Sequence, residues 1–411
     1  MEKSRVLFLS YNGLLEPILP SQVVPYLKEL ARHGFVFTLL TYEKSKDLKS
    51  AGKSGIDSKK SELAACDIEW EYIRYHKNPP FLSTLFDLAA GILKAAHIIS
   101  SKKVRLVHIR GVTPGIIMIV LSKIFRVKIL FDMRGLLAEE YVGGGLWREG
   151  SASFKLVKAA ERHLLEISDA VTTLTYKHME YNKDLDYLAD RSIPMDVIPC
   201  CVDMGHFSQD KGRRDKTRKR LMIDDKFVLM YAGKIGTFYL MDEMLDFFKV
   251  FSKIAPNSIF LIVTNDDAGR AMARVREIGI SEGVIKVING ITFNEMNVYT
   301  ECADAAIFFI NPYKKFGSSP IKMGEFLASG VPVVINPGIG DTEEFVDKYN
   351  IGVVIKSFKE SDFSAGAEKL VSLKSEGGLL AARCRDAASK DLSLEYGVEK
   401  YLSLYKRLIP S

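Results

Sequence analysis

The chain has 411 residues, more than a single hydrophobic core usually supports, so its length predicts two domains. Hydrophobic residues make up 47% of it and charged residues 26%, an ordinary composition for a soluble protein, and the net charge of +6 is a mild excess. The cysteines show no C-x-x-C spacing and no histidine cluster, which argues against a disulfide framework or a structural zinc site and indicates a reducing compartment. They are Cys66, Cys200, Cys201, Cys302 and Cys384.

Two apolar stretches are too short for membrane insertion. The run in "MEKSRVLFLSYNG" is too short for a signal peptide. The stretch "GIIMIVLSKIF", residues 115–125, is broken by Ser122 and Lys123 and is too short to span a bilayer. We therefore expect a cytoplasmic protein, which can also lie at the inner face of the cell membrane.

Strands and helices alternate twice along the chain. Expected strands of the first series are 5–10, 35–41, 68–75, 104–110, 128–133 and 170–175, with helices at 21–33, 84–101, 113–126 and 151–167. A second series follows with strands at 227–233, 259–265, 284–289, 305–310, 331–336 and 352–356. Short apolar strands between helices indicate a parallel sheet covered on both faces, so the fold class is α/β with two doubly wound, Rossmann-like domains facing across a cleft.

The predicted seam between the domains lies near residue 202. We expect an N-terminal domain over 1–202 and a C-terminal domain over 203–391, with a final helix in 392–411 that can pack back on the first domain. The basic run "KGRRDKTRKR", residues 211–220, follows the seam. It can contact acidic lipid headgroups or an anionic polymer, or it can be a solvated helix face; no nucleic-acid motif accompanies it.

Ligands of open α/β sheets bind beyond the carboxyl ends of the strands, so polar residues at these points are candidates. After the first strand, Gly13 either lets a ligand approach the backbone or makes a turn, and no G-x-G-x-x-G is present. After the fifth strand, Asp132 and Arg134 precede a mobile Gly143–Gly145 loop. An acid–base group beside a cation under such a loop suits catalysis, and an ion pair that shapes the loop is the alternative.

A lysine in the first turn of a helix is the sharpest signal in the second half. Ser319 is a good N-cap, Pro320 fits the first helical position and Gly330 ends the helix, so Lys322 lies at the positive end of the helix dipole. A cation is mildly unfavourable at that end of a helix. The repulsion is offset if an anion such as phosphate is bound there. A solvated lysine at a slightly poor position is the alternative.

Two further residues extend this anion hypothesis. Lys234, next to Gly233, follows a strand directly and leads into a helix, so it is a second candidate for a phosphate, although it can also be a surface lysine. Glu325 lies one turn after Lys322 and can either pair with it or accept hydrogen bonds from ribose hydroxyls. Asp266 and Asp267 are ordinary helix-cap residues, so we predict no metal site.

Four segments resemble retaining GT-B glycosyltransferases of family four, including bacterial members that build surface polysaccharides. They are "EPILPSQVVPYLKELARHGFVFTLLT", "VIPCCVDMGHF", "YAGKIG" and, most specifically, "SSPIKMGEFLASGVPVV" at 318–334. The resemblance implies that domain 1–202 lies on the acceptor side and that domain 203–391 binds the nucleotide-sugar donor. It also implies that Lys234 holds the donor diphosphate and that Glu325 binds the ribose.

The chain departs from that family at three points. Tyr239 lies where a second basic residue is usual, and Gly317 lies where the first of two glutamates is usual, so backbone groups of Gly317 and Ser318 would contact the sugar. The usual histidine after the fifth strand is absent, and Asp132 or Arg134 would take its role.

The resemblance implies a metal-independent, hexosyltransferase-like enzyme. It would move a sugar from a nucleotide diphosphate sugar, most simply a UDP-sugar, to a hydroxyl of a glycan or lipid-linked acceptor, with retention, in cell-surface polysaccharide synthesis. No cofactor is needed, because the nucleotide sugar is a substrate. The alternatives are a nucleotide-sugar epimerase on the same fold and a non-catalytic nucleotide-sugar-binding protein.

Overall fold

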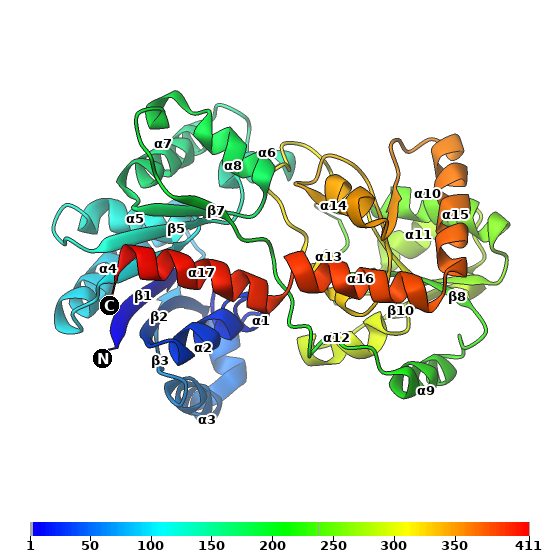
Figure 1. Ribbon diagram of the computed structural model, residues 1–411, viewed down its shortest axis with the longest axis horizontal. Helices are drawn as coiled ribbons and strands as arrows, with labels where there is room; N and C mark the ends of the chain where they lie inside the picture. Colours follow the sequence, from blue (N-terminus) through cyan, green and yellow to red (C-terminus); the bar gives the residue numbers. More distant parts are fainter. Residues whose placement is uncertain (1–2, 237, 411) are drawn as a thin grey trace. The chain divides into compact units, whose positions relative to one another are not determined.

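A computed structural model describes residues 3–236 and 238–410. The chain divides into two compact units (Figure 1). The first runs up to Pro199 and resumes at Gly397, and the second is Cys200–Tyr396. This division lies close to residue 202, where the sequence predicted the seam.

The first unit is built on a seven-stranded parallel sheet with the order β3-β2-β1-β4-β5-β6-β7. The strands are β1 (Ser4–Ser10), β2 (Phe35–Lys44), β3 (Ile68–Tyr75), β4 (Leu106–Arg110), β5 (Lys128–Met133), β6 (Ala170–Thr173) and β7 (Met195–Val197). The helices are α1 (Ile18–Gln22), α2 (Val24–Arg32), α3 (Ser45–Ala64), α4 (Pro80–Ser101), α5 (Val112–Leu121), α6 (Leu137–Gly143), α7 (Ala152–Ile167) and α8 (Tyr176–Lys183), and a 3-10 turn covers Asp186–Leu188.

The second unit repeats the plan with a six-stranded parallel sheet of order β10-β9-β8-β11-β12-β13. Its strands are β8 (Phe227–Ala232), β9 (Ser258–Val263), β10 (Ile285–Ile288), β11 (Ala305–Phe308), β12 (Val333–Ile335) and β13 (Gly352–Val354). Its helices are α9 (Lys211–Leu221), α10 (Met241–Ile254), α11 (Gly269–Glu277), α12 (Phe293–Thr300), α13 (Ile321–Ala328), α14 (Thr342–Tyr349), α15 (Glu360–Ser375) and α16 (Gly378–Asp391), with a 3-10 turn at Glu282–Val284. The prediction of two doubly wound domains is confirmed.

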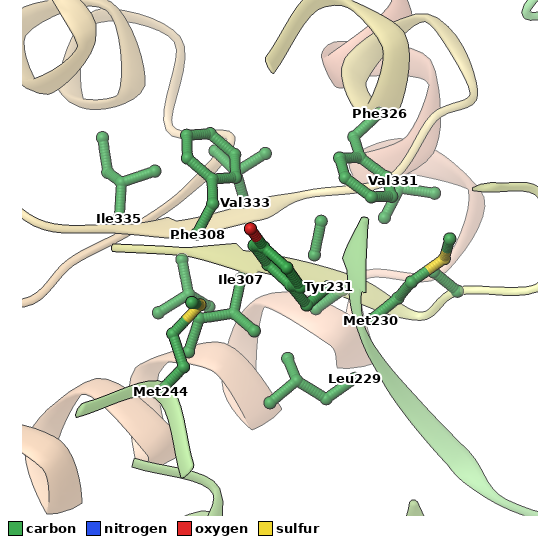
Figure 2. Packing of buried hydrophobic residues seen from close by; sticks show 14 of the residues in the cluster. Leu229, Met230, Tyr231, Met244, Ile307, Phe308, Phe326, Val331, Val333 and Ile335 are labelled. Carbon is green, nitrogen blue, oxygen red and sulfur yellow. The ribbon is translucent and has the colours of Figure 1, made fainter. Parts of the chain in front are cut away.

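Strand order reverses at one point in each sheet, between β1 and β4 in the first unit and between β8 and β11 in the second. Ligands of such sheets bind beyond the carboxyl ends of the strands at these points. Figure 2 shows the core beneath the second point, where Tyr231 of β8 packs near Ile307 and Phe308 of β11. The loops after β8 and before α13 are therefore set on a rigid, buried base.

The last helix, α17 (Leu394–Leu408), begins in the second unit and continues into the first. Within the first unit the ring of Tyr405 packs edge-on against Phe35, with 5.1 Å between the centroids. The Tyr405 hydroxyl lies 2.7 Å from Nδ1 of His108, at the carboxyl end of β4. These contacts attach the tail helix to the first sheet.

Two predicted helix starts are wrong. The helix expected over 21–33 is two helices, α1 and α2, and Ser21 lies inside α1, where its hydroxyl bonds to the carbonyls of Pro17 and Ile18. Ser319 does not cap α13: the N-cap is Pro320, and the Ser319 hydroxyl accepts a hydrogen bond from the amide of Cys200 at 3.1 Å. Lys322 is therefore the second residue of α13, still within its first turn.

The basic run forms α9, but it is not simply a solvated face. Arg213 pairs with Glu301 through both carboxylate oxygens, while Arg214 and Arg218 bond to Asp304 at 2.8 and 3.0 Å. These arginines also bond to backbone carbonyls between residues 301 and 303. Half of the charge assigned to a possible anionic partner is therefore used to hold α9 against the turn between α12 and β11.

Candidate functional site

The loop after β8 places Lys234 at the reversal point of the second sheet. Asp266 accepts a hydrogen bond from the amide of Ile235 at 2.8 Å, and the Tyr231 hydroxyl donates to the carbonyl of Lys234. Both contacts fix the loop backbone, while the Lys234 side chain is exposed. A rigid backbone that carries a free-moving cation suits the binding of an anionic group from solution.

Gly330 ends the helix that carries Lys322, as the sequence predicted. Its φ of +71° is in the left-handed region, and its amide bonds to the carbonyl of Leu327 at 2.9 Å. A backbone of that conformation favours glycine, which stops the helix one residue after its C-cap, Ser329. The helix α13 is therefore short, and Lys322 in its first turn reaches Gly233 after β8.

The ammonium of Lys322 lies in a box of aromatic rings. Its Nζ is 3.6 Å from the ring centroid of Tyr239, 4.6 Å from that of Tyr231 and 5.9 Å from that of Phe308. A ring face attracts a cation by roughly 0.5–2 kcal/mol, so these contacts offset part of the cost of burial. Tyr239, which replaces the second basic residue expected from the resemblance, thus has a defined role beside this lysine.

Gly233 leaves room for the same ammonium. A Cβ added to Gly233 would lie 2.7 Å from the Lys322 Nζ, and its φ of +139° is one that residues with side chains rarely adopt. The glycine is therefore needed both for the turn after β8 and for the close approach of the lysine.

Lys322 is only 8% exposed, and its Nζ has no hydrogen-bond partner among the residues that the structure describes. Burial lowers the pKa of Lys322 to about 7, although the nearby Glu325 acts in the opposite direction. A buried ammonium without hydrogen bonds is costly, and an anion would remove that cost. This arrangement can bind a phosphate.

Glu325 lies on the next turn of α13 and is partly buried. Burial raises the pKa of Glu325 to about 7, against the opposing effect of Lys322. Within the described chain no ion pair joins the two side chains, so the structure does not support the alternative in which Glu325 serves only as the partner of Lys322. Its carboxylate remains available to accept hydrogen bonds from hydroxyl groups.

The loop that leads into α13 contains Gly317 and Ser318. Gly317 is buried and Ser318 is partly buried, and the amide of Ser318 bonds to the carbonyl of Lys315 at 3.0 Å. Lys315 is a functional candidate that sequence reasoning missed: it is buried, with its Nζ 4.1 Å from the centroid of the Phe238 ring. The "KK" pair at 314–315 was the only signal for it.

In the first unit Asp132 lies at the carboxyl end of β5 and is 1% exposed. It accepts hydrogen bonds from Arg110 at 3.2 Å and from the Thr172 hydroxyl at 3.1 Å, and Arg134 lies 3.6 Å away. Burial acts to raise the pKa of Asp132, but Arg134, His108 and Arg110 hold it well below the usual range. This geometry favours the ion-pair alternative, and a role for Asp132 in proton transfer stays a prediction.

His108 joins Asp132 to the tail helix. Its Nε2 lies 3.8 Å from a carboxylate oxygen of Asp132, while its Nδ1 faces the Tyr405 hydroxyl. Burial lowers the pKa of His108, so the imidazole is neutral near pH 7. His108 and Arg110 lie at the carboxyl end of β4, which pairs with β5, and this pairing brings both beside Asp132.

Gly13 is approached closely by a side chain of its own unit. A Cβ on Gly13 would lie 2.5 Å from an Oε2 of Glu43, a residue at the end of β2 that is fully buried. The same carboxylate accepts hydrogen bonds from the amides of Leu14 and Leu15 at 2.5 and 3.2 Å. Glu43 thus explains why a glycine is needed at position 13, and contact between Gly13 and a donor stays a prediction.

The described residues contain no group of three or more His, Cys, Asp or Glu side chains that could hold a metal ion. Asp266 fixes the loop after β8, and Asp267 accepts a hydrogen bond from the amide of Gly269 at 2.9 Å. Both aspartates therefore have structural partners.

Comparison with solved structures identifies the architecture. A sucrose-phosphate synthase from Thermosynechococcus elongatus superimposes with a TM-score of 0.72 and 16% identity, and the match covers 99% of each chain. HepE from Anabaena, solved in complex with UDP-glucose, gives a TM-score of 0.71 at 13% identity over 98% of this chain and 100% of that one. The chain has the GT-B fold.

The GT-B fold alone does not fix the reaction. A putative UDP-N-acetylglucosamine 2-epimerase from Listeria monocytogenes also matches, with a TM-score of 0.60 and 12% identity over 98% of this chain and 96% of that one. No protein-family model and no curated protein sequence matches the chain significantly. The function must therefore be argued from the side chains at the ends of β8 and α13.

Proposed function

We propose that this GT-B protein is a glycosyltransferase that takes a sugar from a nucleotide diphosphate sugar, with UDP as the nucleotide. The acceptor is a hydroxyl of a glycan or a lipid-linked glycan in the synthesis of cell-surface polysaccharide. The anomeric configuration is retained, and no metal is required. HepE, of the same fold, was solved with UDP-glucose, which supports the choice of UDP.

The observation that carries the proposal is the buried ammonium of Lys322 in the first turn of α13, which has no hydrogen-bond partner among the residues that the structure describes. Free amides at the start of a helix and a nearby cation together favour a phosphate group. A diphosphate there would accept hydrogen bonds from the backbone amides at the start of α13 and from the Lys322 ammonium. The exposed Lys234 can supply a third contact from the loop after β8.

The neighbouring residues define the rest of the donor. Glu325 would accept hydrogen bonds from the ribose hydroxyls, as carboxylates do in other nucleotide sites. Gly317, Ser318 and Ser319 would contact the sugar or phosphates through backbone groups, and Gly233 keeps the approach to Lys322 open. These assignments place the contacts to the diphosphate, the ribose and the sugar within one unit.

The chemistry follows from charge. As the bond between the anomeric carbon and the β-phosphate breaks, negative charge builds on the leaving diphosphate, and Lys322, Lys234 and the helix terminus stabilise it. The departing diphosphate takes the proton of the acceptor hydroxyl on the same face of the sugar, which gives retention without a covalent intermediate. Arg134, held by the buried Asp132, would orient the acceptor.

A thermal-shift screen tests the proposal. The purified protein is heated with UDP, GDP, ADP and sugars of each, without added metal, and a ligand at 100 times its Kd should add about 2.7 kcal/mol of stability. A shift with UDP-sugars supports the proposal, and the same donor is then offered with acceptor extracts to measure transfer. No shift with any nucleotide would contradict the donor site.

The two alternatives give different products. An epimerase would convert the donor into a free nucleotide sugar of changed configuration and would need no acceptor. A non-catalytic binding protein would show the thermal shift but no turnover with any acceptor extract.

A further inference from the structure

The helix α4 presents an exposed apolar surface on the first unit. Leu82, Leu85, Phe86 and Leu93 are between 49% and 74% exposed. Their spacing of three, four and seven residues puts them on one side of the helix. Single exposed leucines are common, but a stripe of this kind on one helix indicates an interaction surface.

The opposite side of α4 is packed into the first unit. Leu88, Ala95, Ile98 and Ile99 are buried, and the Tyr42 hydroxyl donates to the carbonyl of Asp87 at 2.9 Å. Among the described residues, Leu82–Ser101 is the one helix segment long and apolar enough to cross a membrane, with 39% of its most apolar window buried. Since α4 is held by these contacts in a folded unit, it can lie on a membrane but not span one.

Exposed cations lie near this surface, while the lysines closest to α4 are paired, Lys94 with Glu71 at 2.8 Å and Lys102 with Glu69 at 2.6 Å. Asp87, the single acidic residue of α4, is fully buried and bonded to His76, and the sequence 112–126 contains no acidic residue. Because α4 and α5 both cross back between parallel strands, they run in the same direction, and they pack against each other. Exposed Lys103, Lys123 and Arg126 therefore gather where the two helices end.

Among the described residues, the two segments that the sequence offered for membrane contact, α9 and α5, lack a stripe of strongly exposed apolar side chains like that of α4. Arg213, Arg214 and Arg218 of α9 are engaged with Glu301 and Asp304, and most of α5 is buried. The other basic residues of α9 are exposed; they are Lys211, Lys216, Lys219 and Arg220. The one strongly exposed apolar residue next to α5 is Ile124, at 69%, and it lies among the cations just named. Exposed apolar residues thus run along α4 from Leu82 to Leu93, and the exposed cations follow beyond its C-terminal end, beside Ile124.

We propose that this surface, the outer side of α4 with Lys103, Lys123, Ile124 and Arg126, docks on an anionic lipid bilayer. The leucines and Phe86 enter the boundary between headgroups and acyl chains, and the cations contact the headgroups. The helix lies in the plane of the membrane. This inference concerns the first unit and does not depend on the donor site.

Vesicle co-sedimentation of the full chain tests it. Wild type should bind vesicles that contain phosphatidylglycerol more strongly than vesicles of phosphatidylcholine alone, and added salt should weaken the binding. The triple variant Leu82→Gln, Phe86→Gln, Leu93→Gln should lower the partition onto anionic vesicles at least about tenfold. The triple charge reversal Lys103→Glu, Lys123→Glu, Arg126→Glu should remove the preference for anionic lipid.

Matched controls come from the second unit. Leu379 and Met222 are 75% and 78% exposed, so the double variant Leu379→Gln, Met222→Gln removes comparable apolar surface elsewhere and should bind like wild type. Lys216→Glu with Lys219→Glu, on the exposed side of α9, should also bind like wild type. Unchanged melting temperatures and unchanged donor-induced shifts confirm that every variant is folded.

Size-exclusion chromatography tests whether a second copy of the chain covers the α4 surface instead of a membrane. If wild type is a dimer that the α4 variant dissociates, and vesicles are not bound, the surface pairs two copies of the chain and the proposal is overturned. A monomeric wild type that binds no vesicle overturns it equally. Binding that responds to the α9 variant instead of the α4 variant would move the contact to the second unit.

Discussion

Lys322 is a buried cation in the proposed donor site, and its burial costs free energy in the ligand-free protein. Its ammonium is enclosed by Tyr231, Tyr239 and Phe308 but has no hydrogen-bond acceptor among the described residues. Ring faces compensate a buried charge only in part, so the free protein holds a cation that a bound anion would stabilise. Such a site lowers the stability of the ligand-free protein and raises its affinity for an anionic donor.

Replacing Lys322 by methionine tests whether the charge lowers stability and raises donor affinity. Methionine fills the aromatic box without the charge, so Lys322→Met should raise the unfolding free energy of the ligand-free protein by about 1–3 kcal/mol at pH 6. The thermal shift with UDP-sugar should disappear, and turnover should fall at least about tenfold, or roughly 1.4 kcal/mol of barrier.

Lys322→Ala separates charge from volume. It should lose donor binding as well, but it leaves a cavity among the rings and should destabilise the protein by about 2–4 kcal/mol. Normal turnover in the methionine variant would show that the amine does not act on the donor.

The pH dependence of donor affinity follows from the lowered pKa of Lys322, about 7 in the folded chain. A UDP-sugar diphosphate keeps its charge through this range, so its affinity should be highest below pH 7 and fall by up to about tenfold per pH unit above it. Isothermal titration at several pH values measures this slope, which should vanish in Lys322→Met and persist in Glu325→Gln. Equal affinities at pH 6 and pH 9 in wild type would contradict it.

The stability of the ligand-free protein depends on pH in the opposite direction to its donor affinity. Between pH 7 and about 10.5 the unfolded chain holds the Lys322 proton and the folded chain does not, so this group makes the protein more stable as pH rises. Burial also raises the pKa of Glu325 to about 7. Between pH 4.5 and 7 the folded chain holds the Glu325 proton and the unfolded chain does not, so the contribution of Glu325 to the unfolding free energy falls as pH rises. The stability gain of Lys322→Met should therefore shrink above pH 7.

At the scale of elements, loops are fixed by side chains from other elements. Asp266 after β9 holds the loop after β8, and Glu43 of β2 holds the loop after β1. α9 is held in the same way, because Arg218 bonds to Asp304 and to the carbonyls of Cys302 and Lys226. Apart from the bond to Lys226, these contacts join segments that are far apart in sequence.

Arg218 is the clearest case for a measurement. It is 6% exposed, and its loss leaves several buried acceptors without a donor, so Arg218→Ala should lower the unfolding free energy by about 3–5 kcal/mol in urea denaturation. Lys219→Ala, on the exposed side of the same helix, should change it by less than about 0.5 kcal/mol. A small effect at Arg218 would mean that α9 is held by its apolar contacts instead.

At the scale of the whole molecule, two sheets of the same plan carry different kinds of charged group at their carboxyl ends. The second unit has buried and exposed lysines beside a helix terminus, while the first has Asp132 between Arg110 and Arg134. In the proposed reaction the second unit neutralises the diphosphate and the first unit receives the acceptor.

This division predicts how the enzyme responds to chelators. Because lysines and helix amides offset the diphosphate charge, EDTA should leave turnover of the UDP-sugar unchanged. The measurement compares initial rates with EDTA and with added Mg²⁺ or Mn²⁺. A loss of activity in EDTA that either ion restores would show that the donor site needs a metal.

The sequence by itself determined the two doubly wound domains, because strands, helices and their order are written in local patterns. Apolar runs of strand length, Gly330 after a helix, and Lys234 and Lys322 directly beyond strands can all be recognised within a few residues. The strand β7 and the helix α3 were missed, since the first has only three residues and the second is almost wholly polar.

Only the tertiary structure decided what surrounds each candidate. The rings around Lys322 come from residues 231, 239 and 308, the carboxylate beside Gly13 comes from β2, and the partners of the α9 arginines come from the turn before β11. Exposure of one side of α4 was equally invisible, since its sequence is apolar on both sides. Local sequence sets backbone conformation, but burial, charge pairing and pKa depend on side chains that meet only when distant segments pack together.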